Sequence, residues 1–186
     1  YETDTNKVLR NSSATLASPS WVEVNDLDSV GGLSTAVADA SKLLNTVMPT
    51  GTIVQVLGTS TSAQAGKNGT SFADTGLNIS ITPKATASKI LLLCSTNGMH
   101  QQAYDVTGLK LLRNVGGGAY TDLTPSTYGF GYSNSYSESA SISYLDSPNT
   151  TSACNYKTQY ACGGVNDCYL QWGGYYTSTM IALEVA

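Results

Sequence analysis

The sequence predicts a mainly β protein in three parts: a short N-terminal β unit (residues 1–26), a helical coiled-coil neck (27–50) and a jelly-roll-like β-sandwich head (51–186). Charged residues make up only 12% of the 186 residues, about half the usual share. The 23 Ser, 23 Thr, 18 Gly and 12 Tyr residues suit strands and turns better than surface helices. Short apolar stretches recur between turn residues from residue 51 onward, and the segment before them repeats with a helical period.

The first part contains two stretches that read as short strands, residues 1–10 and 20–24, joined by a polar segment. Trp21 is its only large apolar side chain, and we interpret it as a packing residue. Because an isolated two-stranded unit is marginally stable in water, we expect this part to pack on another copy or on a neighbouring protein.

The second part carries apolar residues at alternating intervals of three and four, the pattern of a coiled coil. We expect a helix of about 16 to 20 residues, which ends where Pro49 and Gly51 follow. Two interpretations remain open, a helix lying on the β domain and a coiled coil between identical chains, and the narrow seam favours the second. The seam consists of Val30, Leu33, Val37, Ala40, Leu44 and Val47.

The third part is a succession of short strands separated by Gly, Pro and Asn turns, which is typical of a sandwich or jelly roll. Leu77, Ile79 and Ile81 alternate with polar residues, which indicates one buried face and one wet face. Residues 90–94 and 109–112 are apolar on both faces, so we expect another subunit to cover the second face. The expected strands are 52–57, 77–82, 88–95, 108–113, 119–123, 128–132, 140–145, 153–161, 168–172 and 179–185.

Several segments, in the same order along the chain, resemble the C-terminal region of phage tail-fibre and fibre-like virion proteins of the aquatic-phage type. They are residues 48–56, 74–83, 87–92, 144–148 and 178–186, and residues 1–7 with 21–24 are similar to a β unit found upstream in such proteins. The resemblance implies a homotrimeric fibre in the virion, with a jelly-roll-like head and a coiled-coil neck. It implies contact with other virion proteins through the N-terminal region and with a receptor on the host surface.

Two other functions stay open at this point. The first is a fibre that decorates the capsid or tail and binds another virion protein without a receptor role. The second is a non-viral carbohydrate-binding module, which accounts for the β domain and leaves the heptad pattern unexplained.

The four cysteines and one histidine limit the chemistry. Cys94 lies in an apolar run, so we expect a buried free thiol. Cys162 and Cys168 flank a hairpin-like loop, and the sequence leaves open whether they form a disulfide. The resembled proteins carry no cysteines in this region. The cysteine spacing does not match a structural zinc site, and we expect neither a metal nor a cofactor.

Catalysis has little support in the sequence. A Ser-His-Asp site would need His100, and no Gly-x-Ser-x-Gly elbow accompanies it. We interpret His100 as an exposed loop residue and expect no enzyme activity. Carboxylates that a glycosidase would need are present but cannot be paired from sequence: Asp105, Asp122, Glu138, Asp146 and Asp167.

Net charge and hydropathy exclude two classes of partner. The formal charge of −4 argues against nucleic acid, and no apolar run is long enough for insertion into a membrane.

Aromatic rings mixed with Gly, Ser and Asn in residues 128–136 and 172–176 suit adaptable contact surfaces and the binding of host surface glycans. Tyr128, Phe130 and Tyr132 also alternate as a strand would, so they could line a sheet or a trimer interface instead. We expect Trp172 in the core. The candidate receptor-binding residues are Tyr132, Tyr136, Tyr175 and Tyr176.

Overall fold

A computed structural model of the chain describes residues 8–11, 21–24, 49–101, 107–127, 129–133, 137–164 and 166–186. The chain divides into two units, Tyr1–Val47 and Met48–Ala186. In the first unit, β1 (Val8–Asn11) and β2 (Trp21–Val24) form an antiparallel pair, which matches the two predicted strands. The six residues of the predicted heptad seam lie outside the described residues.

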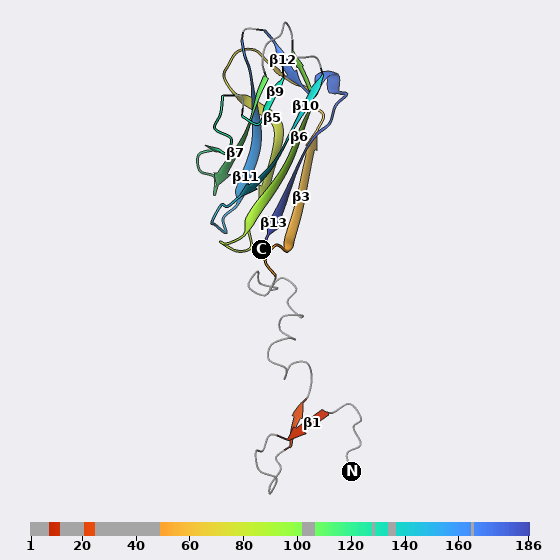
Figure 1. The fold of residues 1–186 in the computed structure, drawn as a ribbon, viewed down its shortest axis with the longest axis vertical. Helices are drawn as coiled ribbons and strands as arrows, with labels where there is room; N and C mark the ends of the chain where they lie inside the picture. Colours follow the sequence, from red (N-terminus) through yellow and green to blue (C-terminus); the bar gives the residue numbers. More distant parts are fainter. Residues whose placement is uncertain are drawn as a thin grey trace. The chain divides into compact units, whose positions relative to one another are not determined.

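The second unit, called the head below, is a β-sandwich of two antiparallel sheets (Figure 1). Sheet I has the order β3-β13-β6-β12-β4, and β10 pairs with the other edge of β6. Its strands are β3 (Ile53–Thr61), β4 (Ala65–Lys67), β6 (Lys89–Gln101), β10 (Glu138–Asp146), β12 (Cys168–Leu170) and β13 (Ser178–Val185).

Sheet II has the order β5-β11-β7-β8, and β9 also pairs with β7. A short 3-10 helix, η3 (Trp172–Gly174), connects β12 to β13. Each of the ten strands predicted for the head overlaps an observed one, and β4 was missed because its sequence, Ala-Gly-Lys, has no apolar alternation. The strands of sheet II are β5 (Ala73–Ile81), β7 (Thr107–Val115), β8 (Thr121–Asp122), β9 (Gly131–Ser133) and β11 (Cys154–Cys162).

The core lies between the two sheets and follows the predicted alternation. Leu77, Ile79 and Ile81 of β5 are buried, while the residues between them are exposed. They pack in one cluster with side chains of β6 and β13, among them Ile90 and Met180. Cys94 is a free, buried thiol in the same cluster, as predicted. Burial of each large apolar side chain contributes about 1.5–3 kcal/mol.

One ion pair joins the two sheets inside the sandwich. The Arg113 guanidinium of β7 donates to both carboxylate oxygens of Asp146 on β10, at 2.7 and 2.9 Å. The Tyr156 hydroxyl of β11 donates to the same carboxylate at 2.6 Å. Burial lowers the pKa of Arg113, but the hydrogen bond and charge of Asp146 outweigh it and leave that pKa above its ordinary value. Asp146 therefore has a structural role, and the sequence could not distinguish it from the other candidate carboxylates.

The chain enters and leaves the head at the same end. The Gly51 amide donates to the Ala186 carbonyl at 2.8 Å, and the Ala186 amide donates to the Thr52 carbonyl at 2.9 Å. We call this the entry end. The strand β6 begins beside it, opposite Val185, and runs to the other end of the head, where Gln101 lies opposite Cys168. This second end, with β9, β12 and η3, is the far end (Figure 1).

Candidate functional site

Three aromatic rings form a cluster at the far end of sheet I. The His100 and Trp172 rings are stacked, with their centroids 4.1 Å apart and their planes at 16°. The Tyr169 ring is tilted against Trp172 at 4.6 Å, and Tyr169 of β12 lies opposite His100 of β6. Trp172 and Tyr169 are half-buried, so the cluster borders the surface of the molecule. We call these three rings the aromatic cluster.

A β-bulge at Gly98 sets the direction of the His100 side chain. Ser139 pairs with Asn97 and Glu138 pairs with Met99, which leaves Gly98 as an extra residue in β6. Its φ of +63° favours glycine. Met99 beyond the bulge is buried in the core, and His100 lies against Trp172. Our expectation of a loop histidine was wrong, because β6 continues through the bulge to Gln101.

Tyrosine rings lie against two glycines of sheet I. A Cβ at Gly98 would be 2.5 Å from the Tyr176 ring, and a Cβ at Gly66 would be 2.7 Å from the Tyr169 ring. Gly66 belongs to β4, the edge strand, directly opposite Tyr169. An aromatic ring over an edge glycine restores the packing that glycine lacks. Larger residues at these two positions would displace the rings.

The loop after η3 presents the most exposed ring of the site. Tyr175 has 86% of its surface exposed, and its ring lies over Gly173. The loop itself is fixed by its backbone, because the Gly173 amide donates to Oε1 of Gln64 at 2.7 Å and the Gly174 amide donates to the Gln171 carbonyl at 2.8 Å. Tyr175 is therefore an exposed ring on an anchored loop.

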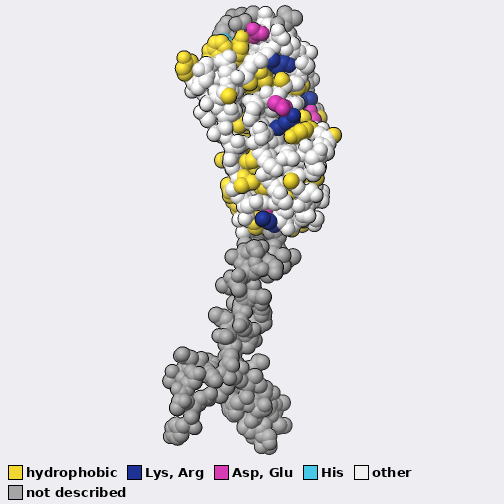
Figure 2. All heavy atoms as spheres, turned by 180° about the vertical axis from the view of Figure 1, so that it is seen from behind, with side chains coloured by type: hydrophobic (Ala, Val, Ile, Leu, Met, Phe, Trp, Pro, Cys, Tyr) yellow, Lys and Arg dark blue, Asp and Glu magenta, His cyan; other side chains and the backbone are white. Residues whose placement is uncertain are grey.

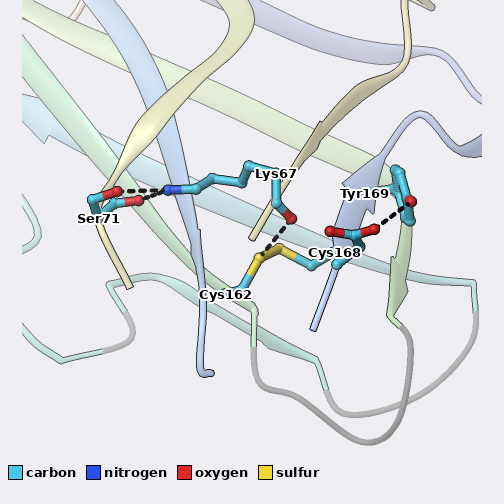
Figure 3. The surroundings of a disulfide bond; sticks show 6 residues. Lys67, Ser71, Cys162, Cys168 and Tyr169 are labelled. Atoms are coloured by element: carbon cyan, nitrogen blue, oxygen red, sulfur yellow. Dashed lines mark hydrogen bonds between the residues drawn. A yellow bond between two sulfur atoms is a disulfide. The ribbon is translucent and has the colours of Figure 1, made fainter. Parts of the chain in front are cut away.

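A disulfide between Cys162 and Cys168 joins β11 of sheet II to β12 of sheet I (Figure 3). The Cα atoms are 5.8 Å apart. The adjoining loop after β4 is fastened to it, since the Cys162 amide donates to the Gly69 carbonyl at 3.2 Å and the Gly69 amide donates to the Gly164 carbonyl at 2.9 Å. The Lys67 ammonium extends to Ser71 and donates to its carbonyl and hydroxyl oxygens (Figure 3). The disulfide thus ties together the loops beside the aromatic cluster.

A pocket of about 270 Å³ opens beside Tyr169. The Tyr169 hydroxyl donates to Oδ2 of Asp167 at 3.2 Å (Figure 3). The pocket therefore combines a ring with a carboxylate and a side-chain amide, which can exchange hydrogen bonds with a hydroxylated ligand, whereas the Lys67 ammonium is held by Ser71. Its lining residues are Gly66, Lys67, Asn68, Asp167 and Tyr169.

The predicted receptor-binding tyrosines fall in different places. Tyr175 is exposed as expected, whereas Tyr176 is half-buried over Gly98. Tyr132 is exposed on β9, in sheet II, so it belongs to the other sheet. Tyr136 lies outside the described residues. Our expectation that Trp172 lies in the core was wrong. Trp172 is half-buried and belongs to neither core cluster, because its ring, carried by η3, stacks on His100 of β6.

Tyr169 and His100 are the functional candidates that the sequence analysis missed. No local signal marks them, because their contact depends on β12 pairing with β6, and these strands lie far apart in the chain.

Three of the carboxylates considered for a glycosidase are engaged in contacts within the fold. Asp122 pairs with Lys110 at 2.6 Å, Asp146 with Arg113, and Asp167 accepts from Tyr169. Asp105 lies outside the described residues. Within the described part of the chain, no three His, Cys, Asp or Glu side chains gather where they could hold a metal ion. No helix in that part has the length and apolar character needed to cross a bilayer.

Comparison with known proteins gives only distant similarity. No family model and no curated protein match the sequence. The crystal structure of the infectious bursal disease virus VP2 subviral particle is similar with a TM-score of 0.44 and 10% identity, over 72% of this chain and 34% of that chain. A structure of the Gx strain of the same virus gives a TM-score of 0.39 and 10% identity, over 72% and 38%. The chain spans about a third of the length of the solved chains it matches, and similarity at this level does not decide function.

Proposed function

We propose that this chain is a structural protein of a virion, the head and neck of a trimeric fibre, and that the far end of the head binds a saccharide on the host cell surface. The observation that carries the proposal is the position of the aromatic site. The chain enters the head at one end, and the uncharged ring of Tyr175 and the aromatic cluster lie at the opposite end. A fibre attached through its N-terminal part would present that end to a cell.

The order of the strands supports a jelly roll for the head. Along the chain, β3, β6, β10 and β13 belong to sheet I, while β5, β7, β8, β9 and β11 belong to sheet II. The first and last long strands, β3 and β13, are neighbours in one sheet, and β5 and β11 are neighbours in the other. Without the short strands β4 and β12, sheet I has the order β3-β13-β6-β10, and sheet II has the order β5-β11-β7 followed by β8 and β9, which both pair with β7. Two layers connected in this way are the arrangement of a jelly roll with two Greek keys, which viral capsid and lectin domains also use.

The chemistry of the far end suits a neutral saccharide. Sugar C–H faces pack on aromatic rings, and hydroxyl groups exchange hydrogen bonds with the Asp167 carboxylate and the Asn68 amide of the pocket. Binding through one such site would be weak, with a free energy of about 4 kcal/mol at millimolar affinity. Three heads on one fibre would raise the effective concentration and give useful avidity.

The test is binding of fluorescently labelled full-length protein to intact bacteria and to an array of bacterial surface polysaccharides. We expect Tyr175→Ala to reduce binding about tenfold, the loss of about 1.4 kcal/mol, because the ring is exposed and available to a ligand. The matched control is Tyr120→Ala, which removes another exposed tyrosine that lies before β8 in sheet II. Its binding should equal that of the unmodified protein.

Ionic strength provides a second readout. Because the site relies on rings and hydrogen bonds, attachment should change little between about 50 and 500 mM salt. Binding that collapses with salt, or that survives Tyr175→Ala unchanged, would contradict the saccharide site. If the unmodified protein binds no cell and no polysaccharide, the far end is better explained as a docking surface for another virion protein.

A further inference from the structure

We infer that the outer face of sheet I packs against the same face of identical chains, which assigns the subunit contact of the head to specific residues. The inference rests on the proposed function for the number of subunits, three. The outer face consists of the outward residues of β3, β13, β6 and β10, which form an aliphatic band and a hydroxyl band. The aliphatic band is Val56, Leu183, Leu91, Leu145, Ile181 and Leu93, and the hydroxyl band is Ser60, Thr179, Ser95, Ser141 and Ser143.

The aliphatic band is continuous across the four strands. Leu183 lies opposite Val56 and Leu91, and Leu91 lies opposite Leu145. In the single chain, 58% of Val56 and 52% of Leu145 are exposed. In the next row, Ile181 lies opposite Leu93, and these residues are 38% and 37% exposed. Contiguous exposed apolar surface of this kind marks an interaction site in a soluble protein.

The hydroxyl band lies directly beyond the aliphatic one, toward the far end. Thr179 lies opposite Ser60 and Ser95, and Ser95 lies opposite Ser141. A shallow groove of about 220 Å³ runs between Ile181, Leu93 and these hydroxyl groups. A Ser or Thr hydroxyl both donates and accepts, so two identical copies of this band can hydrogen-bond to each other without a complementary partner surface.

Charge also favours an identical partner. Between the entry end and the aromatic cluster, the described outward positions of these four strands hold one ionisable side chain, that of Lys89. It lies at the entry end, opposite Val185. Around a three-fold axis, the residues of one chain that face the axis meet the same residues of the other two chains. A charged patch would contact the same charge on another copy and be repelled. The outer face of sheet I can contact the same face of another copy without this repulsion.

The position of the aliphatic band agrees with the heptad pattern of the sequence. Val56 and Leu183 lie on strands that start or end at the entry end, beside Gly51 and Ala186. The last residue of the predicted seam, Val47, precedes β3 by only a few residues. A coiled coil between identical chains would bring their residues near position 47 together, and the aliphatic band begins a few residues later in the chain, at Val56.

The test measures how fast a cysteine on each outer face reacts with a maleimide in the full-length protein. The two native thiols are suited to this experiment, because Cys94 and Cys154 are buried and burial raises the pKa of Cys94 to about 12. We expect Thr179→Cys to react at least tenfold more slowly than Ser80→Cys, although both positions are exposed in the single chain. Ser80 lies on β5, on the outer face of sheet II, and is the matched control.

A charge placed in the band should remove the protection. We expect Ile181→Glu to bring the labelling of Thr179→Cys up to the rate of Ser80→Cys, while Asn78→Glu, one outward position before Ser80 on β5, leaves it slow. Equal rates for the two cysteines without any added charge would overturn the inference. Protection that persists at dilutions where light scattering gives the single-chain mass of 19.4 kDa would also overturn it, since another segment of the same chain would then cover the face. Neither measurement uses a cell or a saccharide, so the receptor proposal can fail while this one stands.

Discussion

The outer faces of the two sheets differ in what they leave to the solvent. On sheet II, Lys157 pairs with Asp74 at 2.7 Å and Lys110 pairs with Asp122 at 2.6 Å. Both ammonium groups also lie over aromatic rings, Lys157 over Tyr120 at 4.3 Å and Lys110 over Phe72 at 4.5 Å. On sheet I, the outward positions of β3, β13, β6 and β10 hold mainly Leu, Ile, Val, Ser and Thr, and Lys89 lies at the entry end.

This difference shows how a chain with few charges distributes them. Charged side chains are sparse on the face of the head that Figure 2 shows, and the outer face of sheet II holds two ion pairs. On sheet II, the charged groups find their partners within one chain. On sheet I, exposed aliphatic side chains remain in contact with water unless another surface covers them. The outer face of sheet II is therefore the one suited to contact with solvent.

The largest expected effect concerns the ion pair between the sheets, whose carboxylate, Asp146, is 6% exposed, whereas Asp122 in the pair on sheet II is 25% exposed. We expect Asp146→Asn to lower the free energy of unfolding by about 3 kcal/mol, because the partly buried Arg113 charge loses its partner. Asp122→Asn removes the same charge from the outer face of sheet II and should cost about 0.5 kcal/mol. Urea unfolding at one protein concentration measures both, and equal losses would mean that burial does not decide the value of these pairs.

The next effect concerns the far end, where the disulfide joins the two sheets. Replacing Cys162 and Cys168 by Ser should cost about 2 kcal/mol, the entropy of closing a short loop. A reductant should lower the melting temperature of the native protein and leave that of the double variant unchanged, since Cys94 and Cys154 are free thiols. A native protein that is indifferent to reductant would show that the loops hold their positions without the bond.

The smallest effect tests the exposed charges of sheet II by their pH dependence. Burial raises the pKa of Asp74, but hydrogen bonds from Lys157 and Gln159 and the charge of Lys157 leave it below its usual value. A depressed pKa contributes stability above the unfolded value and loses it as the pH falls through the folded value. Asp74→Asn should therefore be less stable by about 0.5 kcal/mol at neutral pH and equal to the native protein once the pH is well below the lowered pKa of Asp74. A difference that persists in acid would have a cause other than ionisation.

Much of the fold could be predicted because alternation and turn residues are local signals. The apolar residues of β5 identified its buried face, and the second apolar face of β6, at Leu91 and Leu93, indicated a surface in need of a partner. The ten predicted strands of the head follow from the same signals. The exception, β4, consists of three residues paired with β12, and such a short edge strand is defined by its neighbour and not by its own sequence.

The candidate site was predicted less completely because it depends on pairing between distant strands. Tyr175 was identified from the glycines before it, which indicate an exposed turn. Trp172 was expected in the core, yet its ring is covered by other rings, those of His100 and Tyr169.

The sequence by itself determined the β class, the inward and outward faces of the long strands and the low charge of the surface, because each depends on neighbours within a few residues. The tertiary structure alone decided which strands are adjacent. That adjacency stacks His100 on Trp172 and places Asp146 against Arg113. The physical reason is that these contacts join segments far apart in the chain, and their partners are chosen by the packing of the two sheets, for which no local pattern exists.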